Sequence, residues 1–182
     1  MKGIVFSEFI ELVEDQFSIE IADRILEECN LASGGAYTSV GTYDHAEMVQ
    51  LVVKLSELTN VEVPDLLRVF GQHLTKRFTE LYPAFFQEVG DTFGFLDTIE
   101  NHVHVEVRKL YPDAELPSFQ TERPDTNTLV MNYSSFRPFA DLAEGLILGA
   151  IAHFDDPIAL HRQTAEDYDG TQETFVLTRR AS

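Results

Sequence analysis

The chain has 182 residues, of which 44% are hydrophobic and 24% are charged, and this balance is typical of a folded globular protein. Acidic residues outnumber basic residues by 31 to 13, which gives a formal net charge of −18 at pH 7. Such an excess of negative charge repels phosphate backbones and anionic lipid headgroups. We therefore expect neither nucleic acid nor a membrane surface as a partner.

The cysteine content and the first residues of the chain indicate its compartment. The single cysteine, Cys29, cannot form an intramolecular disulfide, and acidic residues interrupt residues 1–16, where a signal peptide needs an apolar run. The longest apolar stretch, 146–152, is far shorter than the roughly 20 residues that span a bilayer. These features predict a cytoplasmic protein without a transmembrane helix.

Apolar residues at helical spacing predict four helices in the first part of the chain. They cover residues 5–14, 18–30, 44–58 and 64–78, and a glycine-containing loop separates the second helix from the third. Pro64 is expected in the first turn of the fourth helix, where its missing N–H does little harm.

Residues 92–111 show two periodicities at once. The middle of the segment, 102–107, alternates with a period of two and fits a strand, whereas the apolar residues of the whole segment keep helical spacing. The length favours a helix. Acidic residues near the start, basic residues near the end and Pro112 just after it also suit a helix. We expect a helix over 92–111, with a strand as the alternative.

The pattern then changes to two pairs of strands around one helix. The strands are predicted at 118–122, 128–135, 158–161 and 174–178. The turn signal 123–127 separates the first pair, and a helix is predicted at 138–154. This order predicts a single domain over residues 1–182 with an α+β fold. N-terminal helices precede a C-terminal antiparallel sheet with an inserted helix, and the helices pack on one face of the sheet.

His102 and His104 are the histidines whose setting bears most on chemistry. On a helix their side chains point about 200° apart, so one faces the core and the other faces water. On a strand they share a face with Glu106 and form a His-x-His-x-Glu cluster of the kind that binds Zn²⁺ or Fe²⁺. They can also be ordinary polar residues on a half-buried element, and periodicity leaves these interpretations open.

Tyr133, Ser135 and Arg137 follow one another at every second position near the end of a predicted strand. If the extended geometry continues, the three side chains point to one face. Two hydroxyls and a guanidinium in a row suit a carboxylate ligand, because arginine offers it a planar fork of donors. A solvated strand face that happens to carry an arginine is the plainer interpretation.

Several short motifs occur along the chain in a characteristic order and spacing. They are MKGIV (1–5), VFGQ (69–72), HVEVRKLYP (104–112), LPSF (116–119), the Tyr133/Ser135/Arg137 pattern and AEGL (143–146). Together they cover essentially the whole chain, which resembles the haem-nitric oxide/oxygen binding (H-NOX) family. This family comprises the sensor domain of soluble guanylate cyclases and stand-alone bacterial NO sensors. The resemblance implies a sensor rather than an enzyme, with haem b buried between proximal and distal parts of the fold.

The resemblance assigns the iron ligand and the residues around the porphyrin. His104, seven residues before Tyr111, matches the axial ligand of the haem iron, so His102 is a bystander. Pro117 matches the proline that presses on the porphyrin and distorts it. The second nitrogen of such a ligand donates to an acceptor that fixes the ring. The sequence does not name this acceptor.

The haem propionates and the gas pocket also have matching positions. By resemblance Tyr133, Ser135 and Arg137 bind the propionates, and Val5, Phe9, Leu74 and Leu142 line the gas pocket. Family members that hold O₂ stably have a tyrosine at the position of Leu142, because a donor stabilises the partial negative charge of bound O₂. These four side chains donate no hydrogen bond. We expect NO and CO to bind ferrous haem without stable O₂ binding, although the same residues also suit core packing.

The resemblance implies a switch in which NO weakens or breaks the bond between iron and His104. This releases strain that Pro117 and the proximal helix hold, and the ligand acts through its differential affinity for the two states. Because 182 residues leave no room for an output domain, we expect a separate partner, either a histidine kinase or a diguanylate cyclase.

Two other functions stay open at this point. A non-haem metalloenzyme can use His102, His104 and Glu106 if they lie on a strand. A ligand-free α+β interaction module needs no cofactor at all.

Overall fold

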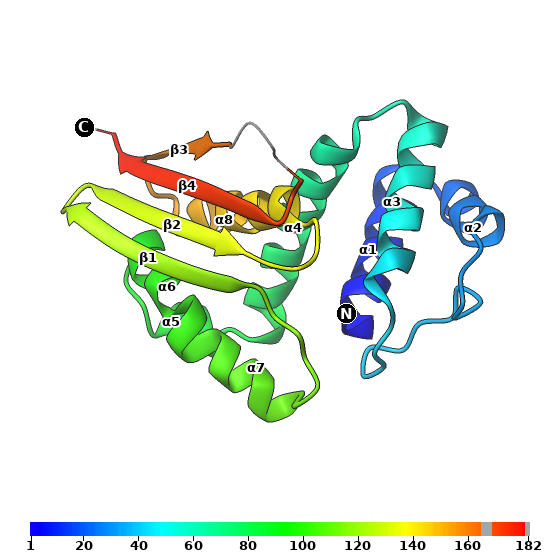
Figure 1. The fold of residues 1–182 in the computed structure, drawn as a ribbon, viewed down its shortest axis with the longest axis horizontal. Coiled ribbons are helices and arrows are strands. Elements are labelled where there is room, and N and C mark those ends of the chain that lie inside the picture. The colour runs from blue at the N-terminus through cyan, green and yellow to red at the C-terminus, as the bar shows by residue number, and fades with distance from the viewer. Residues whose placement is uncertain (165–168, 181–182) are drawn as a thin grey trace. The chain divides into compact units, whose positions relative to one another are not determined.

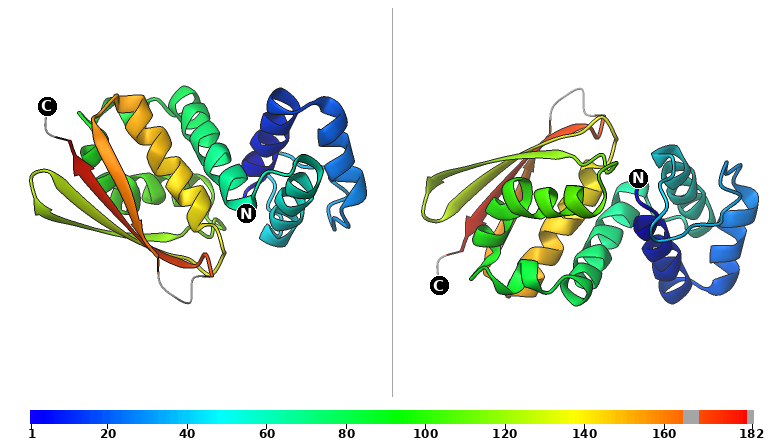
Figure 2. Two further views of the ribbon diagram at one scale, coloured as in Figure 1. Left: turned by 90° about the horizontal axis from the view of Figure 1, so that it is seen from above. Right: turned by 90° about the horizontal axis from the view of Figure 1, so that it is seen from below.

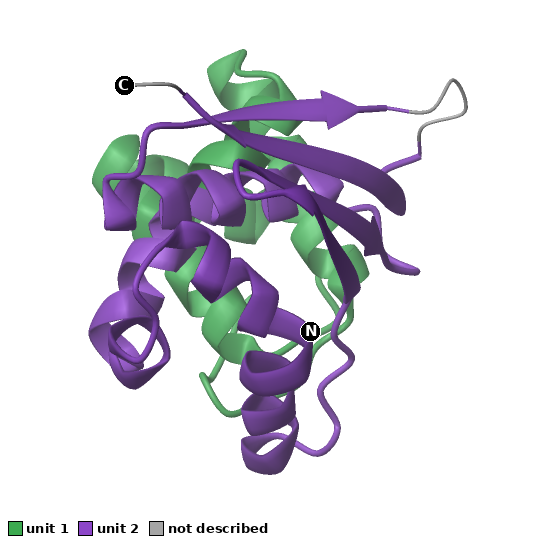
Figure 3. Ribbon diagram, turned by 90° about the vertical axis from the view of Figure 1, so that its left-hand side faces the viewer, with its two compact units in different colours: residues 1–70 green, residues 71–182 purple. Residues whose placement is uncertain are grey.

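The computed structural model describes residues 1–164 and 169–180 (Figure 1). The chain forms two compact units, of which the first covers residues 1–70 and the second covers residues 71–182 (Figure 3). The expectation of one haem-binding domain over 1–182 stays a prediction. Within the described ranges, none of the helices combines the length and apolar character that crossing a membrane requires.

The first unit is helical. It contains α1 (Gly3–Gln16), α2 (Ile19–Glu28), α3 (His45–Thr59) and the first part of α4 (Val63–Leu81). These elements confirm the helices predicted from residues 5, 18, 44 and 64. Two of them begin at a side-chain cap, because Ser18 Oγ accepts the N–H of Ile21 at 3.2 Å and Asp44 Oδ1 accepts that of Ala46 at 2.9 Å.

Aromatic rings and one buried carboxylate organise the core of the first unit. The ring of Phe6 stacks on Tyr37 with centroids 4.4 Å apart, and Phe9 meets Phe70 edge-on at 5.1 Å. The Tyr37 hydroxyl donates to the buried carboxylate of Glu47 at 2.7 Å. The loop before α3 is thus held against that helix.

The second unit begins with the end of α4 and continues through a broken helical segment. Its further helices are α5 (Ala84–Gln87), α6 (Thr92–Thr98), the π-helical turn η1 (Ile99–Val103), α7 (His104–Leu110) and α8 (Ala140–Phe154). The helix predicted over 92–111 is confirmed, with a π-helical turn that the sequence did not indicate. The strand alternative for 102–107 is wrong. The apolar residues of the whole segment keep helical spacing, and Asp91 caps α6 by accepting the N–H of Gly94 at 2.7 Å.

Four antiparallel strands form one sheet in the order β1-β2-β4-β3. They are β1 (Ser118–Asp125), β2 (Thr128–Ser134), β3 (Ile158–Gln163) and β4 (Gln172–Arg179). The turn predicted at 123–127 is too wide, since β1 continues to Asp125 and the connection is only 126–127. Pro124 is tolerated because β1 is an edge strand, where its missing N–H breaks no ladder bond in the interior of the sheet.

The core of the second unit lies on one face of this sheet. Burial alternates along β2 and β4, as expected where one face is covered, and α6 and α8 lie on the covered face (Figure 2). The largest side chains that are fully buried there are Phe93, Leu129, Met131, Phe175 and Leu177. This arrangement confirms the predicted α+β fold.

The second half of α4 crosses α8 at very short range. A Cβ added to Gly71 would lie 2.4 Å from the carbonyl oxygen of Leu142 and 2.6 Å from the amide nitrogen of Leu146. The hydroxyl of Thr75 donates to the carbonyl of Leu146 at 3.0 Å. Glycine at position 71 therefore allows the two backbones to touch, which sets the spacing of the helices that carry Leu74 and Leu142.

Gly71→Ala is expected to lower the free energy of unfolding by about 1–2 kcal/mol. The overpacking cost of about 1–3 kcal/mol exceeds the gain in helix propensity of about 0.5–1 kcal/mol. Urea unfolding followed by circular dichroism measures the change. Gly90→Ala is the matched control, because a Cβ there meets no atom within 4 Å. Equal stability of the two variants would contradict this account of the helix contact.

Candidate functional site

The helical form of residues 92–111 gives the two histidines different environments. His104 begins α7 directly after the π-helical turn and is only 8% exposed. The His102 side chain is 47% exposed, and its ring meets Phe85 edge-on at 5.6 Å. Of the two, His104 is therefore the one enclosed by the protein. The helical interpretation predicted that one of them faces the core, and the family resemblance pointed to His104.

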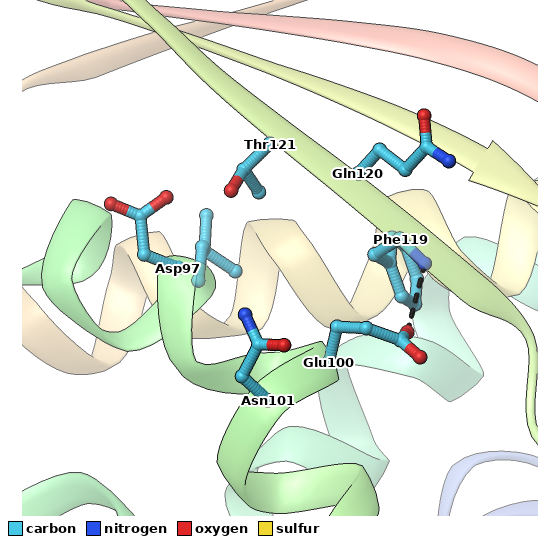
Figure 4. Close-up of a pocket in the computed structure, with 7 residues that line it drawn as sticks. Asp97, Glu100, Asn101, Phe119, Gln120 and Thr121 are labelled. Carbon is cyan, nitrogen blue, oxygen red and sulfur yellow. Dashed lines mark hydrogen bonds between the residues drawn. The ribbon is translucent and has the colours of Figure 1, made fainter.

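The buried ring of His104 contacts a carboxylate from the preceding turn. Its Nδ1 lies 3.3 Å from Oε2 of Glu100. The same oxygen accepts the backbone N–H of Phe119 at 3.1 Å, which links the π-helical turn to β1 (Figure 4). The guanidinium of Arg108 lies 3.7 Å from the other oxygen of Glu100. Glu100 is the acceptor that the sequence did not name.

Burial and charge act in opposite directions on the pKa of His104. Burial lowers the pKa below its ordinary value, and the Glu100 carboxylate partly opposes this shift. The ring is consequently neutral at pH 7, which is the form that coordinates a metal. No hydrogen bond from the described residues engages Nε2, so the contact with Glu100 leaves that nitrogen for a ligand.

A polar cleft of about 330 Å³ lies beside Glu100. It is lined by Leu96, Asp97, Glu100, Asn101, Phe119, Gln120 and Thr121. In Figure 4 the Glu100 side chain reaches from the helical turn towards β1, and Asp97 lies at the other end of the cleft. None of the site residues predicted from the sequence lines this cleft, but Glu100, which contacts His104, lies in its wall.

Tyr133, Ser135 and Arg137 come together, but not through a continuous strand. The expectation of extended geometry through Arg137 is wrong, because β2 ends at Ser134 and the chain bends after it. The buried Tyr133 hydroxyl donates to the carbonyl of Arg137 at 3.4 Å. The Arg137 N–H donates to Ser135 Oγ at 3.1 Å. Hydrogen bonds across the bend therefore replace the shared strand face.

The guanidinium of Arg137 is buried and already faces a carboxylate. Its Nη1 donates to the carbonyl of Glu115 at 3.2 Å, and its Nη2 pairs with the largely exposed carboxylate of the same residue. Its Nε is buried with no hydrogen-bond partner in the described part of the chain. A buried guanidinium with a donor to spare fits a carboxylate-bearing group such as a haem propionate.

The three-residue metal cluster predicted for a strand does not form. Glu106 lies in the first turn of α7 and pairs with Lys109 at 2.6 Å. Within residues 1–164 and 169–180, no group of three or more His, Cys, Asp or Glu side chains is placed to hold a metal ion. The His102/His104/Glu106 interpretation is therefore wrong, because a helix turns His102 and His104 in different directions.

The remaining predicted residues lie in both units. Pro117 is half-buried in the connection between α7 and β1, and Leu74 and Leu142 are buried on α4 and α8, which touch at Gly71. In the first unit, Phe9 is buried and Val5 is half-buried on α1. Their roles in haem distortion and gas binding stay predictions.

Comparison with known proteins identifies the family. The sequence model that describes the haem-NO-binding family matches residues 2–162 of this chain. The chain belongs to this family. No curated protein sequence matches the chain significantly.

Several solved H-NOX structures are similar to this chain over almost its whole length. The unliganded Fe(II) H-NOX protein from K. algicida is 40% identical, with 100% of this chain and 98% of that chain covered and a TM-score of 0.94. The H-NOX from Shewanella woodyi, bound to IWP-051 in the Fe(II)CO state, is 44% identical, with 99% and 95% covered and a TM-score of 0.84. The H-NOX protein from S. oneidensis in the Fe(II)NO state is 25% identical, with both chains covered completely and a TM-score of 0.91.

The family resemblance and the fold expected from it are thus confirmed. The prediction of haem with iron as the cofactor is confirmed at the level of the family. A neutral buried imidazole and a buried guanidinium that faces a carboxylate are groups that suit this cofactor. Glu100 was missed, although its position four residues before His104 on a helix was a signal for their contact.

Arg137→Ala is expected to accelerate haem loss by about 10-fold or more, because a hydrogen bond to a charged group contributes about 1.5–3 kcal/mol. Transfer of haem to an excess of a haem-scavenging apoprotein measures the rate. Arg123→Ala is the control, since Arg123 on β1 pairs with Asp97 on α6 at 2.6 Å and is not one of the predicted propionate ligands. Similar rates for the two variants would exclude the propionate role of Arg137.

Proposed function

We propose that this protein is a haem-based sensor that binds NO and CO at ferrous haem b without holding O₂ stably. The observation that carries the proposal is the buried, neutral imidazole of His104, held through Nδ1 by Glu100, in a chain of the haem-NO-binding family. The Fe(II), Fe(II)CO and Fe(II)NO states of the similar structures support the same chemistry for this chain.

In this proposal each group of residues has one task. His104 binds iron through Nε2, and Tyr133, Ser135 and Arg137 hold the propionates. Pro117 presses on the porphyrin. Haem, when bound, would supply a ferrous iron atom that binds a gas molecule.

The selectivity for NO and CO follows from side chains that cannot donate hydrogen bonds. Val5, Phe9, Leu74 and Leu142 are hydrocarbon throughout, so O₂ gains no stabilising donor from them. The hydroxyl of Thr75, next to Leu74 on α4, donates to backbone carbonyls instead. NO and CO bind ferrous haem without such a donor.

The proposed switch is the release of His104 from iron when NO binds. His104 begins α7, so its release frees the proximal helix and the segment that carries Pro117 to move. The receiving partner is a separate histidine kinase or diguanylate cyclase. The expectation of a cytoplasmic protein, drawn from its single cysteine and acidic first residues, stays a prediction.

His104→Gly is expected to bind haem only when imidazole is added, because the free imidazole replaces the missing ligand. His102→Gly is expected to bind haem without added imidazole, since its side chain is exposed. Absorption spectra in the Soret region distinguish the variants. Uptake of haem by His104→Gly alone, with an unchanged spectrum, would refute the ligand assignment. A wild-type protein that takes up no haem would instead support a ligand-free interaction module.

The ferrous wild-type protein is expected to change its absorption spectrum with NO and with CO, and to form no stable oxygenated species in air. The reason is that the predicted pocket side chains donate no hydrogen bond. Spectra recorded anaerobically and then in air test this. Leu142→Tyr, which adds a hydroxyl, is expected to increase O₂ affinity. A stable oxygenated spectrum in the wild-type protein would overturn the proposed selectivity.

A further inference from the structure

We propose that Glu100 is a positioning residue that tunes the strength of the bond between His104 and iron. This inference rests on the proposed role of His104 as the axial ligand. It starts from the contact between Nδ1 of the buried His104 and Oε2 of Glu100, which are 3.3 Å apart, the Glu100 side chain being 31% exposed. The acceptor is a full carboxylate, which is a stronger partner than a neutral carbonyl.

The local backbone places the two side chains one turn apart. The N–H of His104 donates to the carbonyl of Ile99, five residues earlier, which is the bond that defines the π-helical turn. Glu100 lies at the start of this turn and His104 at its end. Side chains at this spacing are neighbours on one side of a helix. The turn therefore directs a carboxylate at the ring nitrogen that does not bind iron.

Two further contacts hold Glu100 in place independently of His104. The backbone N–H of Phe119 donates to Oε2 at 3.1 Å, and Arg108 lies 3.7 Å from Oε1. The carboxylate is therefore fixed between the helical turn and β1 (Figure 4). Because its position does not depend on the imidazole alone, it can impose one ring orientation and one tautomer on His104, with the proton on Nδ1.

A negative charge at Nδ1–H makes the opposite nitrogen a better electron donor. The carboxylate draws the Nδ1 proton towards itself and increases the electron density at Nε2. A more strongly donating axial ligand favours ferric over ferrous iron and binds iron more tightly. We expect Glu100 to strengthen the His104–iron bond, and thereby to oppose the release of His104 that NO causes.

A purely structural role for Glu100 makes a different prediction. In that case Glu100 serves only to join the π-helical turn to β1 through Phe119. Glu100→Gln separates the two roles, since the amide oxygen still accepts the N–H of Phe119 but the negative charge is lost. A structural role predicts no change in the His104–iron bond, whereas a positioning role predicts a weaker bond.

Resonance Raman spectroscopy of the haem-loaded ferrous protein tests the inference. We expect Glu100→Gln to shift the iron–histidine stretching band to lower frequency and to raise the ferric/ferrous reduction potential. We also expect haem loss to accelerate on the order of 10-fold, the lower end of the range for a residue that supports a metal ligand. Release of His104 after NO addition, followed by absorption, should be faster.

Asp97→Asn is the matched control. It removes a carboxylate from the same helical segment and the same cleft, but Asp97 pairs with Arg123 and not with His104. We expect its Raman band to match that of the wild-type protein. Equal shifts in Asp97→Asn and Glu100→Gln would overturn the inference, because they would show a general effect of surface charge.

Arg108→Gln supplies a test in the opposite direction. The Arg108 side chain is 45% exposed, and its guanidinium lies 3.7 Å from Oε1 of Glu100, where its positive charge partly offsets that of the carboxylate. Its removal should shift the stretching band slightly to higher frequency and leave folding intact. This variant keeps the inference falsifiable even if Glu100→Gln folds poorly. An unchanged band in Arg108→Gln would then overturn the inference by itself, and an unchanged band in a folded Glu100→Gln would overturn it as well.

The outcomes also separate this inference from the proposed function. If the wild-type protein shows no iron–histidine band, His104 is not the ligand and both proposals fail. If the band is present, disappears in His104→Gly and is unaffected by Glu100→Gln, the ligand assignment stands and the role of Glu100 alone is rejected.

Discussion

The contact between a buried imidazole and the carboxylate one helical turn before it is the interaction on which the rest of this site depends. Burial lowers the pKa of His104 and so favours the neutral ring, but burial does not set the orientation of the ring. The Glu100 carboxylate, itself held by the backbone of β1, sets that orientation and directs Nδ1 away from a ligand. The Glu100 side chain thus links the π-helical turn, His104 at the start of α7 and the edge strand β1. A displacement of the imidazole would disturb contacts to all three elements.

The sheet and α8 supply the second fixed part of the site. The start of α8 is tied to the sheet by Arg162 on β3, which pairs with Asp141 at 2.6 Å and with Glu144 at 2.9 Å. Arg162 also pairs with the buried carboxylate of Glu173 on β4. Breaking one partner of such a buried group leaves an uncompensated charge, so the cluster resists displacement. Leu142 lies within this fixed first turn, and its carbonyl oxygen is one of the α8 backbone atoms packed against Gly71 of α4.

Local patterns predicted most of the fold, and the failures have physical causes. The helices at Ser18 and Asp44 were predictable because capping residues precede apolar residues at helical spacing. The competing strand pattern at 102–107 gave way because the apolar stripe of the whole segment must face one core. The turn before β2 was predicted too wide, since a proline on an edge strand need not end it. The residue types gave no indication of the π-helical turn, because such turns depend on the packing around them rather than on local sequence.

The site was predictable only where sequence neighbours are also spatial neighbours. Helical geometry predicted different environments for His102 and His104, and the family resemblance selected His104. Glu100 lies at a spacing that helical geometry also makes close. The hydrogen bond from Phe119 to Glu100 and the pairing of Arg137 with Glu115 join residues 19 and 22 positions apart, so they follow from the fold rather than from local sequence. The sequence predicted that Tyr133, Ser135 and Arg137 lie close together on one strand face. They do lie close together, but hydrogen bonds across a bend after β2 connect them.

The most direct test of the central claim is a crystal structure of the haem-loaded ferrous protein. The account predicts iron bound to Nε2 of His104, with Nδ1 of the same ring facing the carboxylate of Glu100. Iron bound by another side chain, or a His104 ring turned away from the porphyrin, would contradict it.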